Sequence, residues 1–278
     1  MPTDAGAMSA PSRGSLPLDQ IICGDNCEVM RQMPSESIDL VVTSPPYDDL
    51  RTYGGHSWDF YGVAWNLKRL LKPGGVIVWV VADQTKDGGE TGSSMRQALH
   101  FQSIGLALHD TMIYQRKTKP LTHRRYEQEW EYAFVFSSGK PRVFNGLTRP
   151  SKTAGNKTPA VFHRSGDSVD RRVSGSRVAD NCLRGNVWSY TVGGRGSASE
   201  KIAFRHPAIF PEQLAADHVL SWSDPGDIVL DPFSGSGTTA KIASTNGRRF
   251  IGIEVNPEYV EISRKRLAQQ VLPMEAAS

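Results

Sequence analysis

Cysteine is scarce in this chain, which argues against a disulfide-linked protein and against a zinc-binding protein. Only Cys23, Cys27 and Cys182 occur among 278 residues, an odd count that fits reduced thiols better than a disulfide framework. Cys23 and Cys27 have the spacing of metal ligands, but no second Cys/His pair follows to complete a zinc site. We therefore expect neither a disulfide scaffold nor a bound metal.

Long apolar runs are also missing. No segment approaches the length that spans a bilayer, and the amino terminus lacks the basic-then-apolar pattern of a secretory signal. We expect no membrane association and a cytoplasmic location. Residues 1–17 are small, polar and rich in Pro and Gly, so they are predicted to be a disordered tail. A hydrophobic content of 38% and a charged content of 22% suit a globular core in the remainder.

Positive charge is concentrated in one segment, although the net charge is only +3. Residues 137–201 hold twelve lysines and arginines against four acids, so the rest of the chain is mildly acidic. The segment is rich in Gly, Ser, Arg and Asn and shows little periodicity, which is unusual inside a compact domain. It is predicted to be a basic insert that binds a polyanion; the alternative is a flexible, solvated surface loop.

Strand-like and helix-like segments alternate on both sides of this insert. Apolar runs at 38–43, 76–81, 228–230 and 250–254 predict strands, and further strands are expected at 106–114 and 132–136. A short apolar segment at 21–25 precedes them, and helix-like segments separate the strands. This alternation predicts an α/β fold with a mostly parallel sheet. We expect residues 18–136 and 202–278 to form its two halves.

A glycine-rich turn follows the predicted strand at 228–230. The sequence from Asp231 to Thr239 passes through Gly235 and Gly237 into a predicted helix, and it fits the G-x-G-x-x-A nucleotide fingerprint. Glycines let the backbone approach a ligand, and the helix start offers free N–H groups. Glu254 ends the next strand, where an acid binds ribose hydroxyls. The alternative is that Asp231 and Glu254 only cap helices.

Two consecutive prolines end the predicted strand at 38–43. In Ser44-Pro45-Pro46-Tyr47 they fix the backbone and remove two N–H donors. Ligands of open α/β sheets bind at the carboxyl ends of strands, so this turn and the glycine turn can face one pocket. The Ser44 hydroxyl and the Pro45 carbonyl can accept hydrogen bonds from an amino group, and Tyr47 offers a face for a planar base. The alternative is an ordinary turn with a surface tyrosine.

Together, Thr43-Ser44-Pro45-Pro46-Tyr47 and Asp231-Pro232-Phe233-Ser234-Gly235-Ser236-Gly237-Thr238-Thr239 resemble the two signature motifs of amino-methylating DNA methyltransferases. The catalytic motif comes first and the cofactor motif late, as in the circularly permuted β class of that family. Weaker matches follow in the same order, and the resemblance extends from about Ile21 to Leu267. The basic insert falls where the family has its target-recognition region.

The resemblance implies a Rossmann-like methyltransferase sheet that binds S-adenosylmethionine and needs no metal. The catalytic residues it implies are Ser44, Pro45, Pro46 and Tyr47, with Trp130 and Tyr132 beside Tyr47 in the pocket for the target base. The implied cofactor-binding residues are Asp25, Thr43, Phe210, Asp231, Phe233, Ser234, Gly235, Ser236, Gly237, Thr238, Thr239 and Glu254.

The family transfers the methyl group to an exocyclic nitrogen of a base flipped out of double-stranded DNA. Methylation at cytosine C5 needs a nucleophilic cysteine after a proline, and no such pair occurs here. Serine at position 44 favours cytosine N4, whereas aspartate or asparagine there favours adenine N6, which remains the alternative. A nicotinamide-dependent oxidoreductase, a non-catalytic DNA-binding protein and an RNA substrate are further alternatives.

We expect DNA contacts from arginines near the catalytic turn and in the insert: Arg51, Arg124, Arg125, Arg171, Arg172 and Arg177. Arginine serves both phosphate and guanine contacts, so the bases read cannot be assigned from these residues. The family resemblance implies a monomer or homodimer in a restriction-modification or epigenetic role, with a cognate restriction endonuclease as a candidate partner.

Overall fold

The computed structural model describes residues 15–48, 57–116, 126–157, 161–165, 168–172, 176–193 and 197–269. The chain forms two compact units. The first contains residues up to Asn145 and from Asn186 onward, and the second contains Gly146–Gly185. The second unit is shorter than the predicted insert at 137–201, because the segments on either side of it belong to the first unit.

An eight-stranded sheet is the centre of the first unit, in the order β1-β14-β13-β2-β3-β7-β6-β12. Every neighbouring pair in it is parallel except the two pairs made by β7. The α/β class and the mostly parallel sheet are thus confirmed. The strands are β1 (Gln20–Cys23), β2 (Ile38–Thr43), β3 (Leu71–Val81), β6 (Ala107–Arg116), β7 (Trp130–Ser137), β12 (Val187–Tyr190), β13 (Ile228–Asp231) and β14 (Arg249–Glu254).

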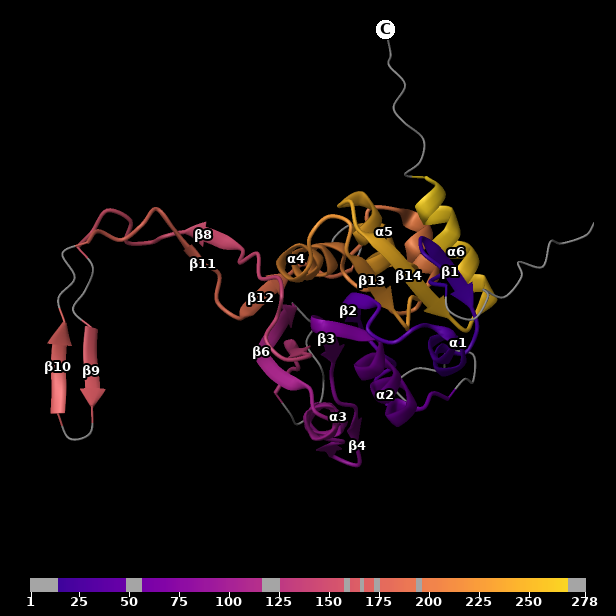
Figure 1. The fold of residues 1–278 in the computed structure, drawn as a ribbon, viewed down its shortest axis with the longest axis horizontal. Coiled ribbons are helices and arrows are strands. Elements are labelled where there is room, and N and C mark those ends of the chain that lie inside the picture. Colours follow the sequence, from indigo (N-terminus) through magenta and orange to yellow (C-terminus); the bar gives the residue numbers. More distant parts are fainter. Residues whose placement is uncertain are drawn as a thin grey trace, which may run out of the picture. The chain divides into compact units, whose positions relative to one another are not determined.

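Helices cover both faces of this sheet, as Figure 1 shows. On one side lie α1 (Asn26–Gln32), α2 (Phe60–Leu70) and α3 (Ser93–Ser103). On the other side lie α4 (Glu212–Trp222), α5 (Thr238–Thr245) and α6 (Pro257–Ala268), and a short 3-10 helix, η2 (Lys201–Arg205), precedes α4. Because both faces are covered, the central strands are mostly apolar, and all six residues of β2 are buried.

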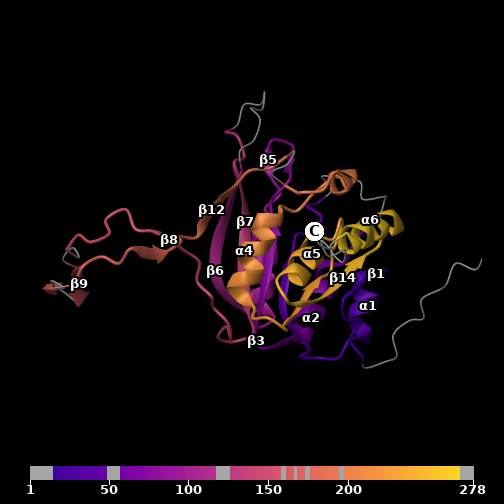
Figure 2. The same ribbon diagram turned by 90° about the horizontal axis from the view of Figure 1, so that it is seen from above.

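The second unit contains two antiparallel pairs, whose four strands are labelled in Figure 1, and Figure 2 labels one strand of each pair from above. In one, β8 (Thr148–Pro150) pairs with β11 (Asn181–Leu183), and in the other β9 (Val161–Ser165) pairs with β10 (Ser168–Arg172). A further hairpin, β4 (Thr85–Lys86) with β5 (Gly89–Glu90), belongs to the first unit.

Lys72-Pro73-Gly74-Gly75 lie inside β3. The pairing between β2 and β3 shifts register there, and Gly74 has a φ of 78°. An irregular strand start accommodates both the proline, which lacks a donor, and the left-handed glycine. In the sequence alone, this Lys-Pro-Gly-Gly pattern predicts the end of a helix.

A cluster of aromatic rings packs around Trp79 of β3 in the core. Trp79 is fully buried and its indole N–H donates to Gln97 Oε1 at 2.9 Å. Its ring packs near Trp58, Phe101 and Phe233 with centroid distances between 5.1 and 6.3 Å. These contacts join the core to the glycine turn, because Phe233 directly follows Asp231 and Pro232. None of the helices that the structure describes is long and apolar enough to cross a membrane.

Arg266 of α6 is a charged residue inside this fold, and its side chain is fully buried. Its guanidinium donates to the Ser236 carbonyl at 2.6 Å, to Thr238 Oγ1 at 3.1 Å and to Glu212 Oε1 at 2.7 Å. A buried arginine is tolerated only with such partners, since an unpaired ion in the interior is strongly disfavoured. It therefore fixes the glycine turn from behind.

We expect Arg266→Met to lower the free energy of unfolding by about 3–5 kcal/mol, because Glu212 and the turn carbonyl lose their buried partner. Urea denaturation followed by circular dichroism measures this loss. The control is Arg264→Met on the same helix, an exposed arginine paired with Glu261 at 3.3 Å, for which a loss of about 1 kcal/mol or less is expected. Equal losses for both variants would contradict the assignment.

Candidate active site

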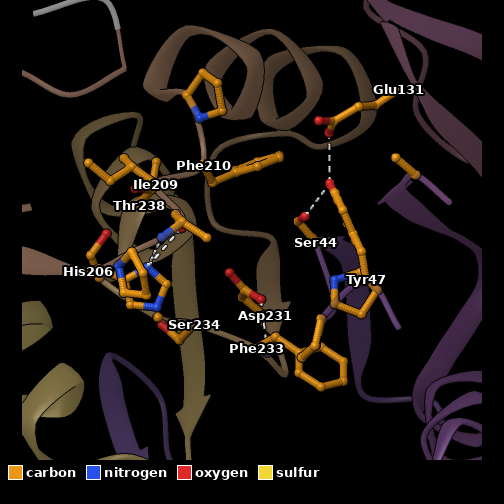
Figure 3. A pocket seen from close by; sticks show the side chains of 18 of the residues that line it. Ser44, Tyr47, Glu131, His206, Ile209, Phe210, Asp231, Phe233, Ser234 and Thr238 are labelled. Carbon is orange, nitrogen blue, oxygen red and sulfur yellow. Dashed lines mark hydrogen bonds between the residues drawn. The ribbon is translucent and has the colours of Figure 1, made fainter. Parts of the chain in front are cut away.

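Several strands end at one edge of the sheet, and the residues that follow them surround a cavity of about 1260 Å³. Parallel strands have their carboxyl ends at the same edge, so β2 delivers Ser44 there, β13 ends at Asp231 and β14 at Glu254. Since β7 runs in the opposite direction, its first residues, including Glu131, lie at this same edge. Figure 3 shows Ser44, Tyr47 and Glu131 on one side of the cavity and His206, Ser234 and Thr238 on the other.

The glycine turn approaches its neighbours too closely for any side chain. A Cβ on Gly235 would lie 3.0 Å from His206 Nε2, and one on Gly237 would lie 2.8 Å from the Cβ of Ser263. Both glycines also have positive φ, 50° and 77°, which other residues rarely adopt. The Ser263 hydroxyl donates to the Gly235 carbonyl at 2.7 Å. The turn is thus fixed between η2–α4 and α6, with its backbone facing the cavity.

Asp231 lies between the two halves of the cavity and is only 6% exposed. Its Oδ1 accepts from the Thr43 hydroxyl at 2.6 Å and from the Phe233 N–H at 3.1 Å. Burial raises the pKa of this carboxyl to about 6, although these hydrogen bonds lower it. A positive charge nearby would therefore favour the ionised form of the Asp231 carboxyl.

Glu254 ends β14 and is oriented by two backbone amides. Its Oε2 accepts from Gly235 N–H at 2.9 Å and its Oε1 from Asn256 N–H at 2.8 Å. A carboxylate has about four acceptor positions, so each oxygen can still bind a hydroxyl from a ligand in the cavity.

The Ser-Pro-Pro-Tyr turn forms the opposite wall. Ser44 Oγ and Tyr47 Oη lie 2.9 Å apart, and the Tyr47 hydroxyl donates to Glu131 Oε2 at 2.7 Å. The other oxygen of Glu131, Oε1, forms an ion pair with Arg116 Nε at 3.0 Å. Burial, and then the charge of Glu131, raise the pKa of Tyr47 well above its usual value, so its proton is retained.

Most of the predicted cofactor residues line this cavity: Asp25, Phe210, Asp231, Phe233, Ser234, Gly235, Ser236, Thr238 and Glu254. Three others lie behind the wall and are not among the lining residues: Thr43, Gly237 and Thr239. Thr43 is fully buried against Asp231, and the Thr239 hydroxyl donates to the Val42 carbonyl at 3.1 Å. These residues support the site from outside the cavity.

All four residues of the Ser44–Tyr47 turn also line the cavity, but Trp130 and Tyr132 do not. They belong to a smaller hollow beside it that also involves Asp83 and Glu90. Their rings pack edge to face at 4.8 Å, and Tyr132 stacks on Phe134. Glu131 lines both the large cavity and this hollow, whereas Trp130 and Tyr132 line the hollow and not the large cavity. Trp58 and Phe210 are instead among the aromatic residues of the cavity.

Most of the predicted DNA-contacting arginines have side chains outside the part of the chain that the structure describes. Arg51, Arg124 and Arg125 lie outside the described residues, as do the side chains of Arg171 and Arg172 in β10. Arg177 is exposed in the second unit, where it donates to the Gly155 carbonyl at 2.7 Å. Within the described ranges, no group of three or more His, Cys, Asp or Glu residues could hold a metal ion.

The sequence profile of the N6/N4 DNA methylase family matches residues 38–265, most of the chain and both turns. The chain belongs to this family of DNA methyltransferases. One relative, described as the orphan methyltransferase M.BamHII of Bacillus amyloliquefaciens, is 49% identical over 241 residues, covering 85% of this chain and 91% of its own.

Solved structures agree with this family and fold. The PvuII DNA methyltransferase, described as cytosine-N4-specific, aligns with a TM-score of 0.64 at 22% identity, covering 96% of this chain and 89% of its own. TTHA0409 of Thermus thermophilus, solved in complex with S-adenosyl-L-methionine, aligns with a TM-score of 0.58 at 27% identity, covering 91% and 95%. The Rossmann-like methyltransferase fold is thereby confirmed. Membership of the family rules out the alternative of a nicotinamide-dependent oxidoreductase.

Sequence reasoning missed Glu131 and Arg116 of this DNA methyltransferase. Glu131 is a charged residue inside an otherwise apolar strand, and its register partner on β6 is Tyr114, two residues before Arg116. A buried acid within such a strand needs a partner, and that requirement was the available signal. The ring of His206 also lies against Gly235 at the cavity wall.

We expect Gly237→Ala to lower the free energy of unfolding by more than the roughly 1–3 kcal/mol of backbone strain alone, because its Cβ also meets Ser263. Thermal unfolding measures the effect. The control is Gly226→Ala, where φ is 88° but nothing lies within 4 Å of the added Cβ. Equal destabilisation by the two substitutions would show that the contact with α6 is unimportant.

Proposed function

We propose that this DNA methyltransferase transfers the methyl group of S-adenosylmethionine to the exocyclic N4 of a cytosine flipped out of double-stranded DNA. The observation that carries the proposal is a single cavity with acceptor groups at Ser44 and Pro45 on one side and the glycine turn, Asp231 and Glu254 on the other. Ligand pockets are typically about 300–1,000 Å³, so a cavity of about 1260 Å³ is large enough for a cofactor together with a base.

The residues on the glycine-turn side fit S-adenosylmethionine. Gly235 leaves room where a Cβ would meet His206, so the ligand can approach the backbone of the turn. Ser234 lines the cavity beside this turn. Glu254 would bind the ribose hydroxyls, and Asp231 would stabilise the positive charge of the ligand. When bound, the cofactor supplies an electrophilic methyl group on sulfur.

The Ser44–Tyr47 turn would hold the amino group that is methylated. An aromatic amine is a poor nucleophile because its lone pair is delocalised into the ring. Hydrogen bonds from the amine to Ser44 Oγ and the Pro45 carbonyl favour a pyramidal nitrogen whose lone pair is available. Holding that nitrogen in line with the reacting carbon provides much of the rate acceleration. The ring of Tyr47 would stack on the base, with Trp58 and Phe210 as further aromatic walls in place of Trp130 and Tyr132.

Serine at position 44 supports cytosine N4, and adenine N6 is the second candidate because the family includes both activities. Either amine offers two N–H donors, so both fit the acceptors of this turn. The motif at 43–47 precedes the one at 231–239, which supports a circularly permuted arrangement in which 18–136 is the catalytic half and 202–278 the cofactor-binding half.

We assign target recognition to the basic segment at 137–201, within which Gly146–Gly185 forms a unit of its own. Its excess of arginine and lysine suits phosphate contacts with duplex DNA. We place the enzyme in the cytoplasm, where it would act on DNA as a monomer or homodimer in restriction-modification or epigenetic marking.

We expect Ser44→Ala and Tyr47→Ala to reduce methyl transfer to DNA by about 100-fold or more, because each removes a group that positions the amine. Incorporation of radiolabelled methyl groups measures the rate, and calorimetry checks that S-adenosylmethionine still binds. The control is Ser103→Ala, an exposed serine at the end of α3.

Mass spectrometry of nucleosides from the methylated DNA identifies the product. N4-methylcytosine is the expected result. N6-methyladenine alone would overturn the choice of base, and full activity in both Ser44→Ala and Tyr47→Ala would overturn the assigned site.

The pKa of Asp231, raised to about 6 by burial, predicts how cofactor affinity depends on pH. A cationic ligand favours the ionised carboxyl, so affinity should be high at pH 7.5 and fall as the pH drops through 6, by roughly tenfold at pH 5. Calorimetry across this range measures it. In Asp231→Asn the affinity should be lower and independent of pH. A pH dependence that persists in this variant would implicate another group, such as His206.

A further inference from the structure

Glu131 is a buried carboxylate whose role the two sequence motifs do not explain. It is 8% exposed, and each of its oxygens has a different partner. Oε1 lies 3.0 Å from Arg116 Nε, and Oε2 accepts from the Tyr47 hydroxyl at 2.7 Å. The Tyr47 oxygen in turn lies 2.9 Å from Ser44 Oγ. Arg116 thus forms an ion pair with Glu131, and hydrogen bonds join Glu131, Tyr47 and Ser44 into a chain that ends at the proposed acceptor of the target amine, as Figure 3 shows.

The chemistry of these groups fixes the direction of every hydrogen in the chain. An arginine is always charged and only donates, and the carboxylate that it pairs with accepts from the Tyr47 hydroxyl. The single hydrogen of the Tyr47 hydroxyl is therefore directed to Glu131. At the contact between Tyr47 and Ser44 either oxygen could donate, but Tyr47 has no second hydrogen. Ser44 must donate, and its own hydrogen points away from the substrate.

This direction has a consequence for the reaction. With its hydrogen given to Tyr47, Ser44 Oγ keeps both lone pairs for the amino group of the target base. Hydrogen bonds in a chain polarise one another, so a carboxylate at the far end makes Ser44 Oγ a stronger acceptor. If the chain ran the other way, Tyr47 would occupy one lone pair of Ser44. The Ser44 hydrogen would then be free to point at the amine, where two donors would face each other.

We propose that Glu131 is a positioning residue that sets the direction of the Ser44–Tyr47 hydrogen-bond chain, so that the Ser44 hydroxyl acts as an acceptor towards the target amine. This inference rests on the proposed function, since it needs an amine at Ser44. Glu131 acts through Tyr47 and does not itself touch the base. Burial and the charge of Glu131 also raise the pKa of Tyr114, its register partner, so that neighbour remains neutral and does not compete for Arg116.

Glu131→Gln tests the proposal because it keeps the shape of the side chain but adds an N–H₂ group. The amide can donate to the Tyr47 oxygen, which allows the Tyr47 hydrogen to turn towards Ser44. We expect kcat for methyl transfer to fall by about 10- to 100-fold, the range of a lost charged hydrogen bond. KM for DNA and the affinity for S-adenosylmethionine should change by less than about threefold, since neither depends on the direction of the chain.

The matched control is Glu129→Gln, which makes the same change of charge two residues earlier, at an exposed side chain. It should keep the kcat of the wild-type enzyme. Thermal unfolding and calorimetric cofactor binding are measured on every variant, so that a folding defect is recognised. If Glu131→Gln does not fold, Arg116→Gln is used, which leaves the carboxylate without its ion-pair partner and should lower kcat in the same way.

A double-mutant cycle separates this role from general packing. Tyr47→Phe removes the hydroxyl through which Glu131 acts, so adding Glu131→Gln to Tyr47→Phe should change kcat by less than about twofold. An equal loss in both backgrounds, or wild-type kcat in Glu131→Gln, would overturn the inference while leaving the proposed function intact. If the wild-type enzyme methylates no exocyclic amine in DNA, the proposed function fails and this inference falls with it.

Discussion

A hydrogen bond of 2.6 Å between the Thr43 hydroxyl and Asp231 Oδ1 joins two motifs that lie 188 residues apart in the chain. It can form because β2 and β13 are parallel neighbours, so the residues that end them lie side by side. The bond is buried, which strengthens it and at the same time orients the Asp231 carboxyl. Both walls of the cavity are built outward from this contact, and their separation depends on the spacing of adjacent strands rather than on any flexible loop.

The walls are in turn supported by residues that never reach the cavity. Ser263 and Arg266 of α6 bind the carbonyls of Gly235 and Ser236, so the glycine turn is fixed from behind by the helix that follows the next strand. On the opposite side, Glu131 and Arg116 hold Tyr47 from β7 and β6. A site that positions two reacting atoms benefits from this rigidity, because small displacements weaken in-line transfer.

Sequence patterns predicted what depends on local chemistry. The two prolines after β2 and the glycines after β13 identified both turns, and the alternation of apolar segments identified the sheet that brings them together. The patterns could not show which face of β7 meets the cavity. Trp130 and Tyr132 looked suited to stacking on a base, but the register with β6 and β3 directs Glu131 inward instead. Register is a long-range property set by pairing, and a one-residue shift would reverse the assignment.

Ser44 alone does not decide between cytosine and adenine as the proposed target. Both amines present two N–H donors, and the turn offers two acceptors whose geometry is set by prolines. Discrimination must come from groups that meet the rest of the ring, and in this cavity the aromatic walls include Trp58, Phe210 and Tyr47. A purine needs more room between such walls than a pyrimidine does. Under the proposed function, ring size would decide which base is accepted, and the direction of the hydrogens of Ser44 and Tyr47 would decide how reactive its amine is.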